Sequence, residues 1–339
     1  MYRPDSKWTW AFLVLALVQA LVLLALEAYA FAQFELSLVN VHTNPNNFAY
    51  TRSVPVSLAV YLFGMLYFLG LVWDALRMRN TIQILGLCLA NVCLMIFGAS
   101  QPRQIQDAVG QLNIQAVHPD IYTKLIPIEI AIPCILAGGT IIMSFLAWKL
   151  YGEFSWSIYK HISADLQMKR RYLTYQIYIS LMKFDFFFFL AFVMQLLVVV
   201  VGQTDPEFWL TVAAVPVIVS ILLLSGYWVS RENIMGMAFV VFFYVAGLVY
   251  FVFKLVRIYN GDKIAYYAPI GKELTIFAVI TILLLVGTIV NAIQCMMNFG
   301  KGLKPYLLTR RNVGVDEKMY NTEMPNLPHS QAPTRMTIE

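Results

Sequence analysis

Residues 274–300 read LTIFAVITILLLVGTIVNAIQCMMNFG and contain no Asp, Glu, Lys or Arg. A helix rises about 1.5 Å per residue, so this stretch is long enough to cross a hydrocarbon layer about 30 Å thick. Seven further apolar segments precede it, and the predicted spans lie near 8–30, 53–73, 80–102, 125–148, 178–204, 208–230, 233–257 and 274–300. The sequence therefore predicts an all-α, polytopic transmembrane helical bundle of eight spans.

The composition agrees with this class of protein. Of the 339 residues, 60% are hydrophobic and 13% are charged, about half the charged share of a soluble domain. We expect residues 1–311 to form the transmembrane helical domain. Residues 312–339 are polar and contain three prolines, so they are predicted to be a disordered cytosolic tail.

The Lys and Arg residues fall unevenly on the two sides of the predicted membrane. With the N-terminus in the cytosol, sixteen lie in cytosolic segments and seven on the opposite side, and Lys183 lies near the cytosolic start of the fifth span. Cytosolic loops retain positive charge, so both termini are predicted to be cytosolic. The same rule explains the net charge of +5, and no nucleic-acid partner is expected.

One alternative concerns the N-terminus. Ala28, Tyr29 and Ala30 follow an apolar stretch and resemble a signal-peptidase site, and cleavage of residues 1–30 would leave seven spans. Residues 8–26 are uncharged, however, and longer than the usual signal core of about 7 to 15 residues. The eight-span form is therefore favoured.

Charged residues within spans are functional candidates by default. Lys183 and Asp185 are two residues apart, so they point about 200° away from each other on a helix and require different partners. Asp74 and Glu232 lie at the right depth for Lys183, whereas Glu129 is expected near the lumenal surface. Each of these charges is expected to be interfacial or ion-paired, which gives a proton pump little support.

Neutral amides lie closer to the middle of several spans. Asn91, Gln195 and Asn291 can hydrogen-bond between helices, or line a polar cavity for a solute. The candidate structural or functional polar sites are therefore Lys183, Asp185, Asp74, Glu232, Glu129, Asn91, Gln195 and Asn291.

A basic segment precedes the fifth span. Lys169, Arg170 and Arg171 either anchor this span on the cytosolic side or also bind anionic lipid. The expected partners are thus the lipid bilayer and possible anionic lipids, while protein partners are not indicated.

Enzyme signatures are absent from the sequence. It contains no HExxH, G-x-S-x-G or P-loop motif, and its four cysteines all lie inside predicted spans without a CxxC pair. We therefore expect no enzyme activity, no cofactor and no metal site.

Three segments carry a resemblance to a known family: Trp8 to Tyr29, Asp74 to Gln83 (DALRMRNTIQ), and Tyr178 to Phe189 (YISLMKFDFFFF). Across about residues 1–310, the chain resembles an uncharacterised family of fungal multi-pass Golgi-apparatus membrane proteins. This resemblance implies a fungal origin and a location in the Golgi or another endomembrane, and it implies no activity.

Three functions remain open from the sequence. The leading hypothesis is a non-enzymatic Golgi or endomembrane protein that acts in trafficking or membrane organisation. The first alternative is a transporter of a neutral or lipid-like solute through a cavity lined by the central amides. The second alternative is a receptor-like protein, which requires the seven-span form.

Overall fold

The computed structural model of the chain describes residues 6–38, 48–114, 120–161, 166–200, 206–259, 267 and 270–301. The predicted tail 312–339 lies outside these residues. The long helices are α1 (Lys7–Leu38), α2 (Phe48–Arg77), α3 (Thr81–Gln111), α5 (Ile121–His161), α6 (Leu166–Val200), α7 (Pro206–Arg231), α8 (Ile234–Tyr259) and α10 (Gly271–Met297).

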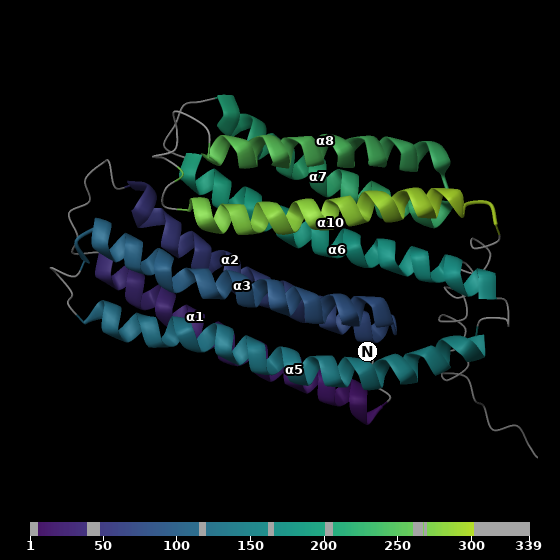
Figure 1. The fold of residues 1–339 in the computed structure, drawn as a ribbon, viewed down its shortest axis with the longest axis horizontal. Helices are drawn as coiled ribbons and strands as arrows, with labels where there is room; N and C mark the ends of the chain where they lie inside the picture. Colours follow the sequence, from purple (N-terminus) through teal and green to yellow (C-terminus); the bar gives the residue numbers. More distant parts are fainter. Residues whose placement is uncertain are drawn as a thin grey trace, which may run out of the picture.

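The described part of the chain is helical and contains no strand, and all eight of these helices are long and apolar enough to cross a membrane. They run side by side along the long axis of the molecule (Figure 1). A helix satisfies its own backbone hydrogen bonds in lipid, so this arrangement is stable in hydrocarbon. The predicted all-α bundle of eight spans is confirmed.

The bundle consists of two groups of four helices. In the first, α1 packs on α2 and α5, and α3 packs on α2 and α5; in the second, α6 packs on α7 and α10, and α8 packs on α7 and α10. The two groups occupy opposite halves of the molecule (Figure 1). They meet mainly where α6 contacts α2 and α3.

The phenylalanines at the start of the fifth span explain why α6 lies at this junction. The ring of Phe184 lies over Gly86 of α3, and the ring of Phe187 lies over Gly64 of α2; a Cβ on these glycines would come within 2.5 Å and 2.9 Å of a ring atom. Phe189 turns the other way and contacts an aromatic ring of α8. Consecutive side chains on a helix point in different directions, so a run of Phe residues contacts several neighbours.

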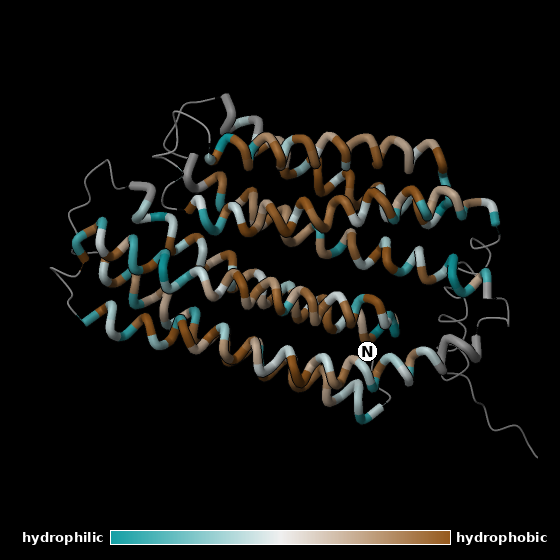
Figure 2. The backbone as a smooth tube through the Cα atoms, in the orientation of Figure 1, coloured by the Kyte–Doolittle hydropathy of each residue, from teal (hydrophilic) through white to brown (hydrophobic). Residues whose placement is uncertain are grey.

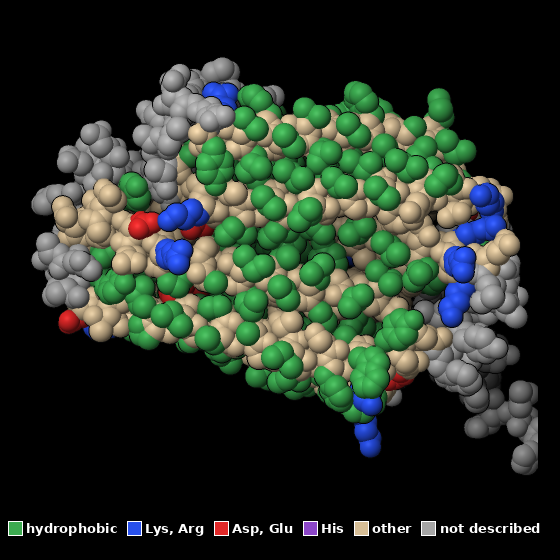
Figure 3. Space-filling view, in the orientation of Figure 1, with side chains coloured by type: hydrophobic (Ala, Val, Ile, Leu, Met, Phe, Trp, Pro, Cys, Tyr) green, Lys and Arg blue, Asp and Glu red, His purple; other side chains and the backbone are tan. Residues whose placement is uncertain are grey.

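Large apolar side chains cover the outside of the bundle. Ile141, Leu223 and Leu283 are each about 70% exposed, at 73%, 71% and 68%. Hydrophobic residues dominate the middle of the helices and polar ones gather toward their ends (Figure 2), and apolar side chains cover most of the visible face (Figure 3). This is the surface expected of a protein embedded in lipid.

Helix α1 is an integral part of the bundle. It continues through Ala30 to Leu38, and it buries Phe12, Ala16 and Leu23 completely. Removal of residues 1–30 would take these side chains out of the core, so the packing favours the eight-span form over the cleaved one.

The two ends of the bundle are named here by residues of α1. The Lys7 end holds the start of α1, the end of α2 and the end of α10. The Leu38 end holds the end of α1, the end of α3 and the start of α5.

Candidate functional site

Helix α3 carries a line of buried polar side chains through the first group of helices. Gln83, Asn91, Gln101 and Gln104 are at most 4% exposed. A buried amide needs hydrogen-bond partners, and each of these finds them on another helix. The partners form three polar layers between the Leu38 end and the Lys7 end.

The layer toward the Leu38 end contains two glutamates. Glu27 of α1 and Glu129 of α5 are both 0% exposed. The Nε2 atom of Gln101 donates a hydrogen bond of 2.7 Å to Glu27 Oε1. The carboxyl groups of Glu27 and Glu129 interact electrostatically, and the Tyr61 hydroxyl of α2 interacts with both of them. All four helices of the first group therefore contribute to this layer, which we call the glutamate layer.

Most oxygen atoms of the glutamate layer have no hydrogen-bond partner. These are Glu27 Oε2, both carboxylate oxygens of Glu129, the Tyr61 hydroxyl and Gln101 Oε1. Among the described residues, no Lys or Arg forms a salt bridge with either glutamate. An uncompensated carboxylate in a low-dielectric interior costs several kcal/mol, so two such groups side by side require protons or a bound cation.

The middle layer consists of bonded amides. Gln19 Nε2 of α1 donates to Asn91 Oδ1 at 2.9 Å, and Asn91 Nδ2 donates to the Thr140 hydroxyl of α5 at 2.8 Å. Gly139 makes room for this layer, because a Cβ there would lie 2.0 Å from Gln19 Oε1. Asn91 thus links three helices, as predicted for an interhelical amide.

The layer at the Lys7 end joins the two groups of helices. Lys183 of α6 forms a salt bridge with Asp74 of α2. Gln83 of α3 bonds to both: its Oε1 accepts from Lys183 at 3.1 Å, and its Nε2 donates to Asp74 Oδ2 at 3.0 Å. The prediction of a partner for Lys183 is confirmed for Asp74, whereas Glu232 accepts from the backbone N–H of Gly300.

Asp185 points to the second group of helices, away from Lys183. It is 4% exposed, and its Oδ2 accepts a hydrogen bond of 2.5 Å from the Thr288 hydroxyl of α10. Asn291 of the same helix donates to the Thr174 carbonyl of α6 at 3.1 Å. Gln195 is buried, and neither of its amide atoms has a partner. The structure therefore does not bring Asn91, Gln195 and Asn291 together.

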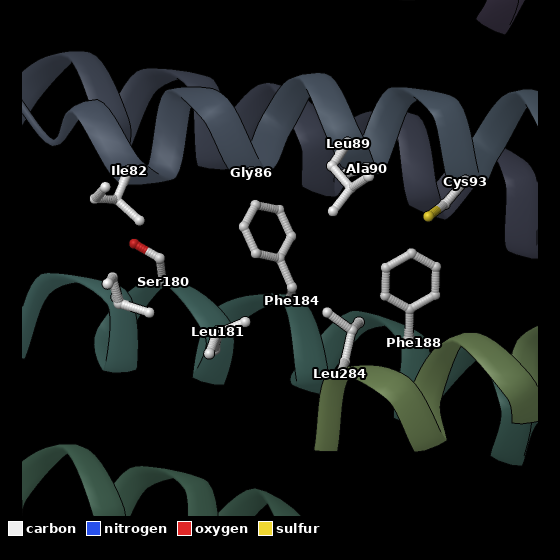
Figure 4. A pocket seen from close by; sticks show the side chains of 11 residues that line it. Ile82, Gly86, Leu89, Ala90, Cys93, Ser180, Leu181, Phe184, Phe188 and Leu284 are labelled. Atoms are coloured by element: carbon white, nitrogen blue, oxygen red, sulfur yellow. The ribbon is translucent and has the colours of Figure 1, made fainter. Parts of the chain in front are cut away.

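A small apolar groove lies between α3 and α6. Its volume is about 90 Å³, and it is lined by Ile82, Gly86, Leu89, Ala90, Cys93, Ile177, Ser180, Leu181, Phe184, Phe188 and Leu284. Figure 4 shows the two phenylalanine rings between the helices, with the Ser180 hydroxyl at one edge. The lining is almost entirely hydrocarbon, so this groove gives the central amides no polar cavity.

The three predicted lipid-binding residues lie near the start of α6. Lys169 and Arg170 are exposed, while Arg171 donates a hydrogen bond of 2.6 Å to the Lys301 carbonyl. Two of the three positive charges are therefore available at the Lys7 end, and the third is held against the end of α10.

The sequence underestimated the burial of the glutamates. Glu129 was expected near the lumenal surface because it follows Lys124 closely, and the structure shows that its side chain is completely buried between helices. Glu27 directly follows the uncharged stretch 8–26, and α1 continues for eleven residues beyond it. A heptad spacing gives the missed signal: Ala16, Leu23 and Ala30 are seven residues apart, and Glu27 lies in the same buried stripe of α1.

The comparisons with known proteins identify the family. No family model and no solved structure matches the chain. The chain is 34% identical over 319 residues to a UPF0658 Golgi apparatus membrane protein of Schizosaccharomyces pombe, a match that covers 88% of this chain and 89% of that protein. This chain therefore belongs to the UPF0658 family of Golgi apparatus membrane proteins.

Proposed function

We propose that this chain is a non-enzymatic transporter of the Golgi membrane, in which Glu27 and Glu129 bind and release a proton or a cation. One observation carries the proposal: two fully buried carboxyl groups lie together in a membrane-embedded bundle, without a basic partner among the described residues. Ionisable groups inside the membrane are costly, and in membrane proteins they mark ion paths and proton relays.

The surroundings of the glutamate layer support a role in transport. One turn from Tyr61, Gln101 and Glu129 toward the Leu38 end lie the buried side chains of Leu58, Ile105 and Leu125, and the Gln19–Asn91 layer lies on the Lys7 side. A site closed on both sides corresponds to the occluded state of a transporter. Because α1, α2, α3 and α5 together form the site, movement of these helices relative to one another would open it on either side.

This proposal differs from transport of a neutral solute through a cavity lined by amides. Gln19, Asn91 and Thr140 bond to one another and so have few free groups for a solute. Their arrangement supports a structural role for the central amides, and the carboxyl groups of the glutamate layer are the better candidates for the chemistry.

Flux measurements test the proposal. The purified full-length chain is reconstituted into proteoliposomes, and proton or cation movement is followed with entrapped dyes under an imposed gradient. We expect gradient-driven flux in the wild type and its loss in Glu27→Gln and Glu129→Gln. Glu273→Gln is the matched control, because Glu273 is a buried carboxyl group in the first turn of α10, outside the glutamate layer. Folded wild-type protein without any flux would contradict the proposal.

A second candidate function is trafficking or membrane organisation, and one observation favours it. Exposed Lys169 and Arg170 lie at the Lys7 end, where the charge distribution predicts the cytosol. Basic side chains at this depth attract anionic headgroups. This role requires no buried carboxyl group, so Glu27→Gln would leave it intact and thereby distinguish the two functions.

A further inference from the structure

We propose that the glutamate layer is a binding site for a hard divalent cation, of the class of Ca²⁺, Mg²⁺ or Mn²⁺. This inference rests on the proposed transport function and names the cargo or coupling ion. The proposal concerns five oxygen atoms on four helices: Glu27 Oε2, both oxygens of Glu129, the Tyr61 hydroxyl and Gln101 Oε1.

The two neutral groups are the evidence that points to a ligand beyond the acidic pair. Tyr61 is 0% exposed and Gln101 is 1% exposed, and neither the Tyr61 hydroxyl nor Gln101 Oε1 has a hydrogen-bond partner. Buried polar atoms in folded proteins nearly always have partners. These two atoms, together with Glu27 Oε2 and both carboxylate oxygens of Glu129, which also lack partners, indicate that a bound species completes their coordination.

The packing holds these groups in place and leaves room beside them. The Tyr61 ring stacks on Phe97, with ring centroids 5.9 Å apart. Gly98 follows Phe97 on α3, and a Cβ at Gly98 would lie 3.5 Å from the Tyr61 ring and 3.7 Å from Gln101 Oε1. The absence of a side chain at Gly98 therefore keeps space next to both neutral ligands.

The donor set determines the chemical class of the ion. All the free atoms are oxygens, which hard cations prefer, and no Cys or His takes part, as softer metals would favour. Two carboxylates match the charge of one divalent ion. The described residues contain no group of three or more His, Cys, Asp and Glu side chains, so a hydroxyl and an amide carbonyl complete the ligands. This inference departs from the sequence, which predicted no metal site.

A path of polar groups extends from the glutamate layer toward the Leu38 end. Gln104 lies one turn from Gln101 on α3, and its Oε1 accepts a hydrogen bond of 2.7 Å from the Ser57 hydroxyl of α2. Its Nε2 donates to the Ser53 carbonyl at 3.4 Å, one turn closer to the end of the bundle. Oxygen atoms on successive turns give a partly dehydrated cation intermediate contacts on its way to the site.

Thermal unfolding of the purified, metal-stripped full-length chain in detergent tests the site, with CaCl₂, MgCl₂ and MnCl₂ as the added probes. A ligand that binds only the folded state raises the melting temperature with concentration. We expect at least one of the three ions to do so in the wild type, and Glu273→Gln to behave in the same way. In Tyr61→Phe, which removes only the hydroxyl, we expect about tenfold weaker binding.

The double variant Glu27→Gln, Glu129→Gln has a distinctive expected behaviour. Without metal it should be at least as stable as the wild type, because it lacks two uncompensated buried carboxyl groups. With metal it should show no shift. If the two glutamates had only a structural role, the double variant without metal would be less stable than the wild type.

Other outcomes separate the site from the transport function. If none of the three ions stabilises the wild type while proton flux in proteoliposomes depends on Glu27 and Glu129, the divalent site is wrong and the transport function stands. If an ion binds through these residues but neither it nor protons cross the membrane, the site stands and the transport function is wrong.

Discussion

Lys183 of α6 and Asp74 of α2 form a salt bridge that ties the two four-helix groups together at the Lys7 end. Gln83 of α3 bonds to both side chains, so three helices meet at this point. The side chains of Lys183 and Asp74 are 24% and 39% exposed, which places the bridge between a surface pair and a buried one.

The partner of Lys183 can be verified by charge removal. Lys183→Met should lower the stability of the detergent-solubilised protein by about 1 kcal/mol, because the bridge is partly exposed and its remaining charge can reach water. Adding Asp74→Asn should recover part of this loss, since both charges are then absent. The measurement is the unfolding midpoint and the monodisperse yield of each variant.

Glu232→Gln is the matched control for this rescue. Glu232 was the other predicted partner, but it bonds to the backbone of Gly300. Rescue of Lys183→Met by Glu232→Gln in place of Asp74→Asn would contradict the observed pairing.

Two adjacent glycines of α5 should differ in their tolerance of a methyl group. Gly139→Ala should lower stability by about 1–3 kcal/mol, because its Cβ would displace the Gln19 amide from Asn91. Gly138→Ala should be tolerated, because no atom lies within 4 Å of its added Cβ. Thermal unfolding of both variants in detergent measures the difference.

The Gly139 defect also has a specific rescue. Combining Gly139→Ala with Gln19→Ala removes the clashing amide, so the double variant should be more stable than the sum of the two single changes predicts. Additive losses would mean that Gly139 does not act through Gln19.

The positive charges predict that both ends of the chain face the cytosol. Tags placed at the N-terminus and the C-terminus should both be digested by protease added to sealed Golgi vesicles, because cytosolic loops retain Lys and Arg. Protection of either tag, or loss of the N-terminal tag as a short fragment before protease is added, would contradict the eight-span topology.

Anionic lipid should stabilise the protein through the start of α6. Adding phosphatidylserine to neutral lipid nanodiscs should raise the melting temperature of the wild type, at about 1 kcal/mol per exposed basic residue. The double variant Lys169→Gln, Arg170→Gln should lose most of this effect, and Lys124→Gln at the Leu38 end should retain it. If all three proteins are equally stable in neutral nanodiscs and in nanodiscs with phosphatidylserine, these residues have only an anchoring role.

The sequence predicted the spans well but underestimated the helices. The predicted span 80–102 was drawn from one charged residue to the next, whereas α3 runs from Thr81 to Gln111. The predicted span 125–148 similarly became α5, from Ile121 to His161. Charged residues end the hydrocarbon-embedded part of a helix, but they do not end the helix, because its backbone bonds continue into the headgroup region.

Helix periodicity alone also predicted that two charged residues of the fifth span have different partners. The two-residue spacing of Lys183 and Asp185 required different faces, and the structure places Lys183 against α2 and α3 and Asp185 against α10. The expected depth of each charge in the membrane then left two candidate partners for Lys183, and Asp74 is the one that it contacts.

The sequence by itself determined that this chain forms eight membrane spans, because the transfer of apolar side chains into hydrocarbon depends on composition and length alone. Only the tertiary structure decided that Glu27 and Glu129, about a hundred residues apart, lie together with Tyr61 and Gln101. Whether a buried polar group is satisfied depends on its neighbours from other helices, and helix packing sets those neighbours. Linear distance from the nearest charge carries no information about them.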